Sequence, residues 1–123
     1  MSKFTKEELD DALNILNSVI GRCEKAQQKF QQGASQHTLL KNRIKALYIS
    51  KSLILNEDIE NKYTEVELSK ALPPVCSVIS KCEKAQKKFK KDSYNYKHYE
   101  KMIKAMEISK SLIEAELNKR DYA

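Results

Sequence analysis

Glycine and proline are scarce in this sequence, since its 123 residues contain only two of each. Tryptophan is absent, and no apolar run approaches the ~18 residues that a membrane-spanning helix requires. A sheet of several strands would need more turns than so few glycines and prolines supply. Strong helix formers such as Lys, Glu, Leu, Ala and Gln fill most of the chain. We therefore expect long α-helices joined by few turns.

Cysteine is also sparse, and its spacing argues against a disulfide framework. The three cysteines, Cys23, Cys76 and Cys82, are odd in number and form no CxxC motif. Residues 1–6 lack the apolar core of a signal peptide, so we expect a cytoplasmic protein with reduced thiols. Cys23 and Cys82 fall on apolar stripes, which predicts buried and inert side chains. Cys76 corresponds to the polar Asn17 and is the expected exposed thiol.

The strongest signal is an internal repeat, which emerges when the chain is aligned with itself at an offset of 59 residues. Positions 4–54 align with positions 63–113 without a gap and share 24 of 51 residues. The segment from Cys23 to Gln27 recurs unchanged from Cys82 to Gln86, and 49–54 recurs as 108–113. A tandem duplication accounts for this pattern, with repeats at 4–57 and 63–116.

Each repeat begins with the same helix-start pattern. Thr5 is followed three residues later by Glu8, and Thr64 by Glu67, which is the signature of a capping box. Apolar residues then recur every three or four positions, as on one face of an amphipathic helix. Gly33 favours a left-handed stop for the first helix. The pattern predicts helices at 5–32, 36–58, 65–91 and 95–118.

These helices would form two antiparallel hairpins within a single domain that covers residues 1–123. Each hairpin has one apolar stripe and cannot bury both of its sides alone, so the two must cover each other or a second chain. We therefore expect an all-α four-helix bundle with pseudo-two-fold symmetry, present as a monomer or a homodimer. Small residues four positions apart would let neighbouring helices approach closely: Ala46 and Ser50, and Ala105 and Ser109.

Two consecutive prolines distinguish the repeats. Pro73 and Pro74 replace Asn14 and Ile15 inside the third predicted helix. Proline removes a backbone donor and crowds the preceding turn, so we predict a kink or a restart near residue 73. A bend that reshapes a partner groove is the alternative interpretation, and nothing in the sequence favours it.

Signatures of catalysis, metal binding and cofactor binding are missing from the sequence. The two histidines, His37 and His98, have no glutamate three residues before them, as a di-iron bundle would require. Glycine occurs only at positions 21 and 33, which leaves no glycine-rich phosphate loop. The repeated Cys-Glu-Lys-Ala-Gln segment is best explained by a polar contact of Gln27 and Gln86 at a pseudo-symmetric core. We therefore predict no catalytic residue, metal site or cofactor, and no enzymatic activity.

The excess positive charge is concentrated in the second repeat. Residues 1–62 carry a net charge of +2 and residues 63–123 a net charge of +4, which together give the +6 of the chain. Lysines interleaved with tyrosines could bind phosphates or stack on unpaired bases. A solvated helix face is the alternative, because arginine forks are absent from this stretch. The candidate binding patch consists of Lys81, Lys84, Lys87, Lys88, Lys90, Lys91, Tyr94, Tyr96, Lys97 and Tyr99.

Residues 80–86 and 36–47 resemble segments of small helical proteins of Gram-positive bacteria that have no assigned function. The resemblance covers each hairpin and implies no activity, substrate or functional residue. The second repeat departs from the later segment, since Tyr96 to Glu100 replace His37 to Lys41. Equal roles for the two turns are therefore in doubt.

Two classes of function fit these observations best. The leading hypothesis is a non-enzymatic interaction or regulatory protein that presents helix faces to a protein partner. The alternative is nucleic-acid binding through the basic, tyrosine-containing second hairpin. An immunity-type bundle that neutralises a toxin is a more remote alternative, which rests on analogy of fold alone.

Overall fold

The computed structural model describes residues 3–121 as an all-α structure, so the ends of the predicted domain, 1–2 and 122–123, lie outside the described residues. The all-α prediction is confirmed, because the described chain contains helices and no strand. Four helices are long, and a short fifth helix lies between the second and the fourth. Their bounds are α1 Lys6–Gln27, α2 Ser35–Ile54, α3 Ile59–Lys62, α4 Glu65–Gln86 and α5 Tyr94–Asp121.

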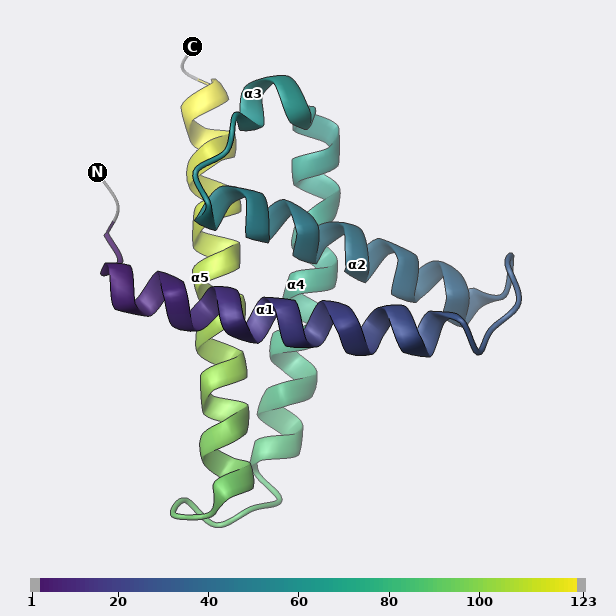
Figure 1. Ribbon diagram of the computed structural model, residues 1–123, viewed down its shortest axis with the longest axis vertical. Helices are drawn as coiled ribbons and strands as arrows, with labels where there is room; N and C mark the ends of the chain where they lie inside the picture. The colour runs from purple at the N-terminus through teal and green to yellow at the C-terminus, as the bar shows by residue number, and fades with distance from the viewer. Residues whose placement is uncertain (1–2, 122–123) are drawn as a thin grey trace.

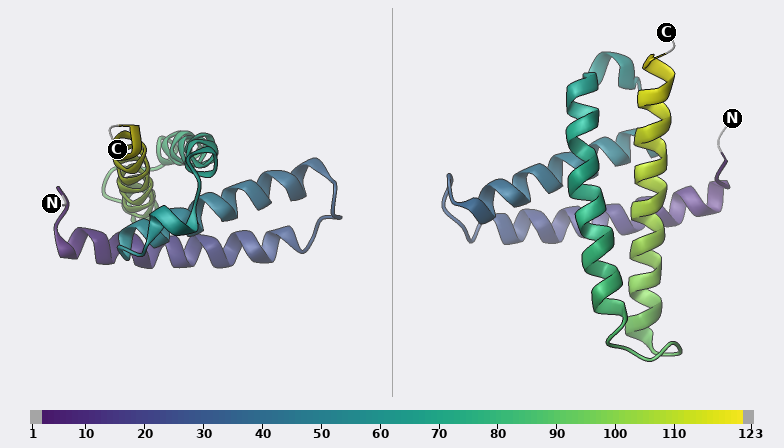
Figure 2. Two further views of the ribbon diagram at one scale, coloured as in Figure 1. Left: turned by 90° about the horizontal axis from the view of Figure 1, so that it is seen from above. Right: turned by 180° about the vertical axis from the view of Figure 1, so that it is seen from behind.

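The long helices form two antiparallel hairpins that cross each other (Figure 1). Helices α1 and α2 make the first hairpin, and α4 and α5 make the second. Viewed from above, the first hairpin is a layer laid across one side of the second (Figure 2). The turn of each hairpin projects beyond the crossing, and α3 lies at the opposite end of the second hairpin from its turn.

The core fills the crossing and draws on all four long helices. Leu16, Ile49, Leu68 and Met106, one from each of these helices, have 0 % of their surface exposed. The small residues expected to allow close approach are also buried, and the Ser50 and Ser109 hydroxyls donate hydrogen bonds to the carbonyls of Ala46 and Ala105. Each hairpin thus covers the apolar side of the other.

Both predicted capping boxes are present. The backbone N–H of Glu8 donates to Thr5 Oγ1 at 3.0 Å, and the Thr5 N–H donates to Glu8 Oε1 at 2.9 Å. Thr64 and Glu67 make the same reciprocal pair at 3.1 and 3.0 Å. Because each box satisfies two backbone donors that a helix start leaves free, it fixes where α1 and α4 begin.

The predicted ends of the first and third long helices were wrong by about one turn. Helix α1 ends at Gln27 rather than near 32, and α4 ends at Gln86 rather than near 91. The lysines and glutamines that follow are good helix formers, but tighter backbone turns at Phe30 and Phe89 replace the helical pattern there. Gly33 does have a left-handed φ of 95°, but it lies in the turn rather than at the helix end.

The linker between the hairpins contains structure that the sequence reasoning missed. Helix α2 ends at Ile54, four residues before the prediction, because Asn56 adopts a left-handed φ of 56°. The N–H groups of Asn56 and Glu57 bond back to the carbonyls of Leu53 and Ser52, which is a Schellman motif. The short helix α3 follows. The second hairpin lacks this stop, so α5 continues to Asp121.

The two prolines do not interrupt α4. Pro73 and Pro74 lie within its continuous span, so the predicted restart near residue 73 was wrong. Ala71 and Val75, on either side of the pair, are buried against the core. We attribute the continuity to this packing, because tertiary contacts can offset the backbone bonds that proline removes.

An arginine near the end of α5 fastens the linker to the second hairpin. Arg120 Nη1 donates to the Tyr63 carbonyl at 2.8 Å, and Nη2 donates to the Ile59 carbonyl at 3.0 Å. Its Nε pairs with Glu116 at 3.0 Å, and both side chains are 12 % exposed. The guanidinium fork therefore satisfies carbonyls of α3 and of the residue that follows it.

Candidate interaction surface at the tip of the second hairpin

The turn between α4 and α5 is held by local hydrogen bonds. Gln86 Nε2 donates to the Tyr96 carbonyl at 3.3 Å and so ties the end of α4 to the first turn of α5. Ser93 caps α5, because its hydroxyl accepts from the Tyr96 N–H at 3.1 Å and donates to the Lys90 carbonyl at 2.7 Å. The residues of this turn, 87–99, form a defined end that we call the Lys/Tyr tip.

Four aromatic rings form a connected series at the Lys/Tyr tip. Tyr94 stacks on His98 with ring centroids 6.2 Å apart and planes 7° apart. His98 meets Tyr99 edge-on, and Tyr99 stacks on Phe89 at 6.0 Å. Tyr94 is 82 % exposed, whereas Tyr99 packs against the core. The series thus runs from the core outward to a ring that faces solvent.

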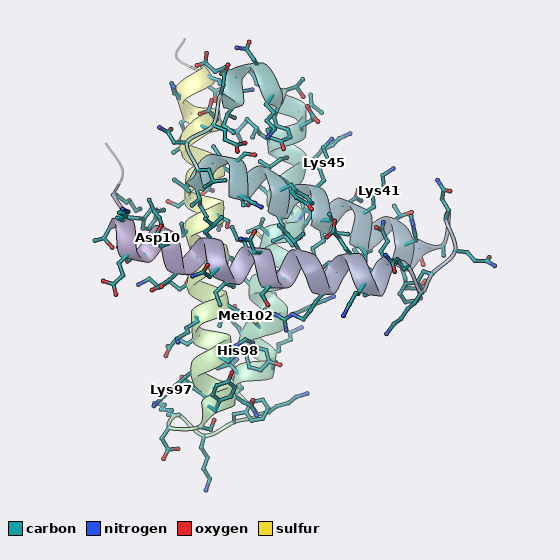
Figure 3. The ribbon with its side chains drawn as sticks, viewed as in Figure 1. Asp10, Lys41, Lys45, Lys97, His98 and Met102 are labelled. Atoms are coloured by element: carbon teal, nitrogen blue, oxygen red, sulfur yellow. The ribbon has the colours of Figure 1, made fainter. Side chains whose placement is uncertain are left out.

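The lysines of the candidate patch are all exposed. Lys87, Lys88, Lys90 and Lys91 lie in the turn, and Lys97 lies beside His98 on α5 (Figure 3). Lys81 and Lys84 are further back along α4. Of the three tyrosines, Tyr94 is exposed, while Tyr96 and Tyr99 are half-buried. The structure therefore brings most of the patch to one hairpin end, where Tyr94 is its outermost ring.

The two ends of the second hairpin carry opposite charge. Residues 80–101 contain eight lysines and three acidic residues, a net charge of +5. The other end, residues 55–67 and 113–121, contains eight acidic residues and three basic residues, a net charge of −5. We call it the acidic linker end. Helix α5 has 28 residues and spans about 42 Å at ~1.5 Å per residue, and the nearest charges of the two ends, Lys101 and Glu114, are about 20 Å apart along it.

The tip of the first hairpin has the same framework but a different surface. Gln27 Nε2 donates to the His37 carbonyl at 3.4 Å, as Gln86 does to Tyr96. The polar contact expected of Gln27 and Gln86 thus closes the two hairpin turns, and its placement at a pseudo-symmetric core was wrong. At the positions of Lys87, Lys90, Lys91 and Tyr94, the first tip carries Gln28, Gln31, Gln32 and Ser35.

The three cysteines have the exposure that the sequence predicted, with Cys23 and Cys82 buried and Cys76 exposed. Burial raises the pKa of both Cys23 and Cys82, and the nearby Arg43 opposes this rise. Arg43 Nε and Nη2 are themselves buried without a hydrogen-bond partner. A raised pKa keeps a thiol protonated and weakly nucleophilic at neutral pH. The inertness of these cysteines stays a prediction.

A serine, a lysine and a glutamate meet near the linker. Lys62 Nζ lies 3.2 Å from Ser52 Oγ and 2.8 Å from Glu57 Oε1. The Glu57 carboxylate raises the pKa of Lys62, and Lys62 in turn lowers the pKa of Glu57. A lysine that acts as a general base requires a lowered pKa instead. Lys62 is thus a cation that fastens the linker to α2.

A groove of about 380 Å³ lies between α1 and α5. Ala12, Ile15, Ala105 and Ile108 supply its apolar part. Its polar rim carries charges of both signs, and Glu8 pairs with Lys104 across it at 3.0 Å. The groove is open to solvent and bridged by this ion pair, so Glu8 and Lys104 neutralise each other there.

Comparison with protein-family models, curated proteins and solved structures finds no match for this chain. Within residues 3–121, no cluster of three or more His, Cys, Asp or Glu side chains could hold a metal ion. None of the helices in that range has the length and apolar character needed to cross a membrane.

Proposed function

We propose that this protein is a non-enzymatic interaction protein of the cytoplasm that binds an acidic protein partner through the Lys/Tyr tip. The observation that carries the proposal is the separation of charge along the second hairpin, from +5 over residues 80–101, which include the Lys/Tyr tip, to −5 at the acidic linker end. An acidic partner is attracted to one end and repelled from the other. The molecule is therefore steered into an end-on approach.

The chemistry of the Lys/Tyr tip fits a protein partner. Exposed lysines around the turn accelerate encounter with carboxylates and set its dependence on salt. Tyr94, which is 82 % exposed, offers the amphipathic ring that is enriched at the centres of protein interfaces. The stacked His98 supports this ring, and the hydrogen bonds of Ser93 fix the turn that carries it. The tip thus presents its groups without prior folding.

The proposal is tested with a fluorescein-labelled Glu-rich peptide and its Lys-rich counterpart at several salt concentrations. We expect the Glu-rich peptide alone to bind, with an affinity that falls as salt rises. Replacement of Lys87, Lys88, Lys90 and Lys91 by Gln should weaken binding about tenfold, since exposed charge pairs contribute ~0.2–1 kcal/mol each. The matched control replaces four exposed lysines elsewhere, Lys6, Lys25, Lys29 and Lys41. Equal losses in both variants would contradict a site at the tip.

Single-stranded nucleic acid is the second candidate partner, and the Tyr94–His98 stack is the observation that favours it. A base could extend this stack at ~1–3 kcal/mol per base, while the lysines neutralise phosphates. A labelled oligonucleotide should then compete with the Glu-rich peptide, and Tyr94→Ala should weaken the oligonucleotide more than the peptide. Equal effects of Tyr94→Ala on both ligands would count against base stacking.

We further infer that the chain is a tandem duplication whose hairpins, 4–57 and 63–116, form a pseudo-two-fold four-helix bundle. Two ion pairs support this: Glu8 with Lys104 at 3.0 Å, and Lys45 with Glu67 at 2.7 Å. Adding 59 to the numbers of Glu8 and Lys45 gives Glu67 and Lys104, so the pairs are reciprocal, as in an isologous interface. A crystal structure in which the two segments do not superpose would contradict this inference.

A further inference from the structure

We propose that the partner of the Lys/Tyr tip is the acidic linker end of a second copy of this chain, so that copies associate head to tail. This inference rests on the proposed function, because it names the partner of the same surface. The Lys/Tyr tip projects beyond the crossing, and the acidic linker end lies at the opposite end of the second hairpin, where the linker leaves α2 (Figures 1 and 2). The exposed side chains of both ends, such as Tyr94 and Glu60, are open to an approaching copy.

The acidic linker end offers a receptor of matching chemistry. A hollow of about 160 Å³ lies between the linker and α5, and its apolar contribution comes from Leu53 and Ile59. Glu57, Asp58 and Glu60 supply carboxylates around it. The Glu60 side chain is 66 % exposed, and its contact with Lys119 is long, at 3.7 Å. The lysines around Tyr94 at the tip complement the carboxylates that line this mostly polar hollow.

The net charge of +6 opposes self-association only weakly at physiological salt. The nearest charges of the two ends, Lys101 and Glu114, are about 20 Å apart along α5, whereas the Debye length at physiological ionic strength is ~8 Å. Each end therefore interacts with what faces it rather than with the charge of the whole molecule. In a head-to-tail contact, the facing ends carry +5 and −5.

The geometry sets the kind of assembly. The two complementary surfaces lie at opposite ends of one hairpin, so a pair of copies in contact leaves one tip and one acidic linker end unoccupied. Such a heterologous contact does not close on itself by a two-fold axis and extends into a row of copies. The average mass should therefore keep rising with concentration instead of levelling off at that of a dimer.

Sedimentation equilibrium of the whole chain at low and high salt tests the proposal. The wild type should exceed its monomer mass of 14.2 kDa at low salt and return to it at high salt. The tip-reversed variant carries Lys→Glu at positions 87, 88, 90 and 91. The linker-reversed variant carries Asp58→Lys, Glu60→Lys and Glu114→Lys, at three exposed positions. Each variant alone should stay monomeric at every concentration.

The variant that carries both sets of reversals is the decisive sample. Its facing ends carry net charges of −3 and +1, which are opposite in sign but smaller than those of the wild type. It should therefore associate more than either single-reversal variant and less than the wild type. If net charge alone controlled association, the variants would associate in a different order. Each Lys→Glu change removes two charge units, so the tip-reversed chain falls from +6 to −2. With the smallest net charge, it would associate most. Circular dichroism checks that each variant folds. If a reversal unfolds the chain, the neutral changes Asp58→Asn, Glu60→Gln and Glu114→Gln should still reduce association.

A wild-type chain that stays monomeric at low salt would overturn the inference, as would a folded linker-reversed variant that still associates. The Glu-rich peptide separates the two proposals, because the linker-reversed variant should bind it as tightly as the wild type does. Peptide binding without self-association would leave the proposed function standing and remove this inference. Absence of both peptide binding and self-association would contradict the proposed function as well as this inference. Oligonucleotide binding by a chain that stays monomeric would identify nucleic acid as the occupant of the tip instead.

Discussion

The two hairpins share their framework and differ at their turns. Both begin with a Thr-Glu capping box, both close their turn with a glutamine to a backbone carbonyl, and both bury an Ala–Ser pair in their second helix. The first tip is rich in glutamine, whereas the second is rich in lysine and tyrosine. Shared residues make the caps, the turn closures and the buried Ala–Ser pairs. At the turns, the lysines of the second tip lie where nothing in the fold requires them, and we take this as the mark of a binding surface.

The core should show the largest effect, because equivalent leucines are buried to different degrees. Leu68 is fully buried, while its counterpart Leu9 is half-buried. Leu68→Ala should lower the free energy of unfolding by about 3–5 kcal/mol, through lost transfer energy and a residual cavity. Leu9→Ala should cost about 1–2 kcal/mol. Urea denaturation of both variants measures the two losses in free energy of unfolding. Equal losses would contradict the difference in burial between Leu68 and Leu9.

The arginine at the end of α5 comes next. Arg120→Met should lower the free energy of unfolding by about 1–3 kcal/mol, because the Tyr63 carbonyl loses the Arg120 donor and the Ile59 carbonyl keeps only the Tyr63 N–H. Arg120→Lys should lose less stability than Arg120→Met but remain less stable than the wild type, because an ammonium group cannot donate to both carbonyls as the guanidinium does. The matched control is Asn118→Ala on the same helix. That side chain is exposed, so the change should stay within about 0.5 kcal/mol. Faster hydrogen exchange confined to residues 59–63 would support the assignment.

Loss of the Gln27 or Gln86 side-chain hydrogen bond should have a smaller effect, similar in the two hairpins. Gln27→Ala and Gln86→Ala each remove one side-chain hydrogen bond to the returning helix. We expect about 0.5–1 kcal/mol from each, because distances of 3.3–3.4 Å indicate weak bonds. Thermal denaturation of the two variants in parallel gives the comparison. A loss of stability in only one of the two variants would show that the two turns are stabilised differently.

The smallest effect concerns pH. A hydrogen bond to the Thr5 backbone and then one to Lys104 lower the pKa of Glu8. Lys45 and then the Thr64 backbone lower the pKa of Glu67. A carboxyl whose pKa is lower in the folded state stabilises the fold above its unfolded pKa, near 4.5, and this contribution is lost as pH falls through the folded pKa. Stability should therefore fall below about pH 4.5, and a chain with both Glu8→Gln and Glu67→Gln should lose less there.

The sequence predicted the features that depend on local chemistry. Helix starts followed from the Thr5 and Thr64 patterns, and the burial of Cys23 and Cys82 followed from their place on the apolar stripes. Features set by tertiary packing were missed. The end of α1 depends on a contact of Gln27 with a residue ten positions later, and the passage of α4 through Pro73 depends on the core around it. The hydrogen bonds of Arg120 join it to carbonyls 57 and 61 residues earlier in the chain. A periodic pattern in the sequence cannot predict contacts over such distances.

The candidate patch was visible in the sequence because lysines and tyrosines are adjacent there. The acidic linker end was not, because its two segments, 55–67 and 113–121, are far apart in the chain and meet only in the fold. The stacking of Tyr94 on His98 likewise depends on the helical spacing of α5. The residues of a charged surface can thus be identified in the sequence. The opposite charges at the two ends of the second hairpin can be recognised only in the structure.

An exchange of the two tips tests most directly whether the second tip is the binding surface on a shared framework. The exchanged chain carries Gln28→Lys, Gln31→Lys, Gln32→Lys and Ser35→Tyr in the first hairpin, and Lys87→Gln, Lys90→Gln, Lys91→Gln and Tyr94→Ser in the second. Its composition and net charge are those of the wild type. Binding of the Glu-rich peptide, mapped by hydrogen exchange, should move from residues 87–99 to residues 28–40. Binding that stays at 87–99, or that disappears while the chain remains folded, would contradict the account.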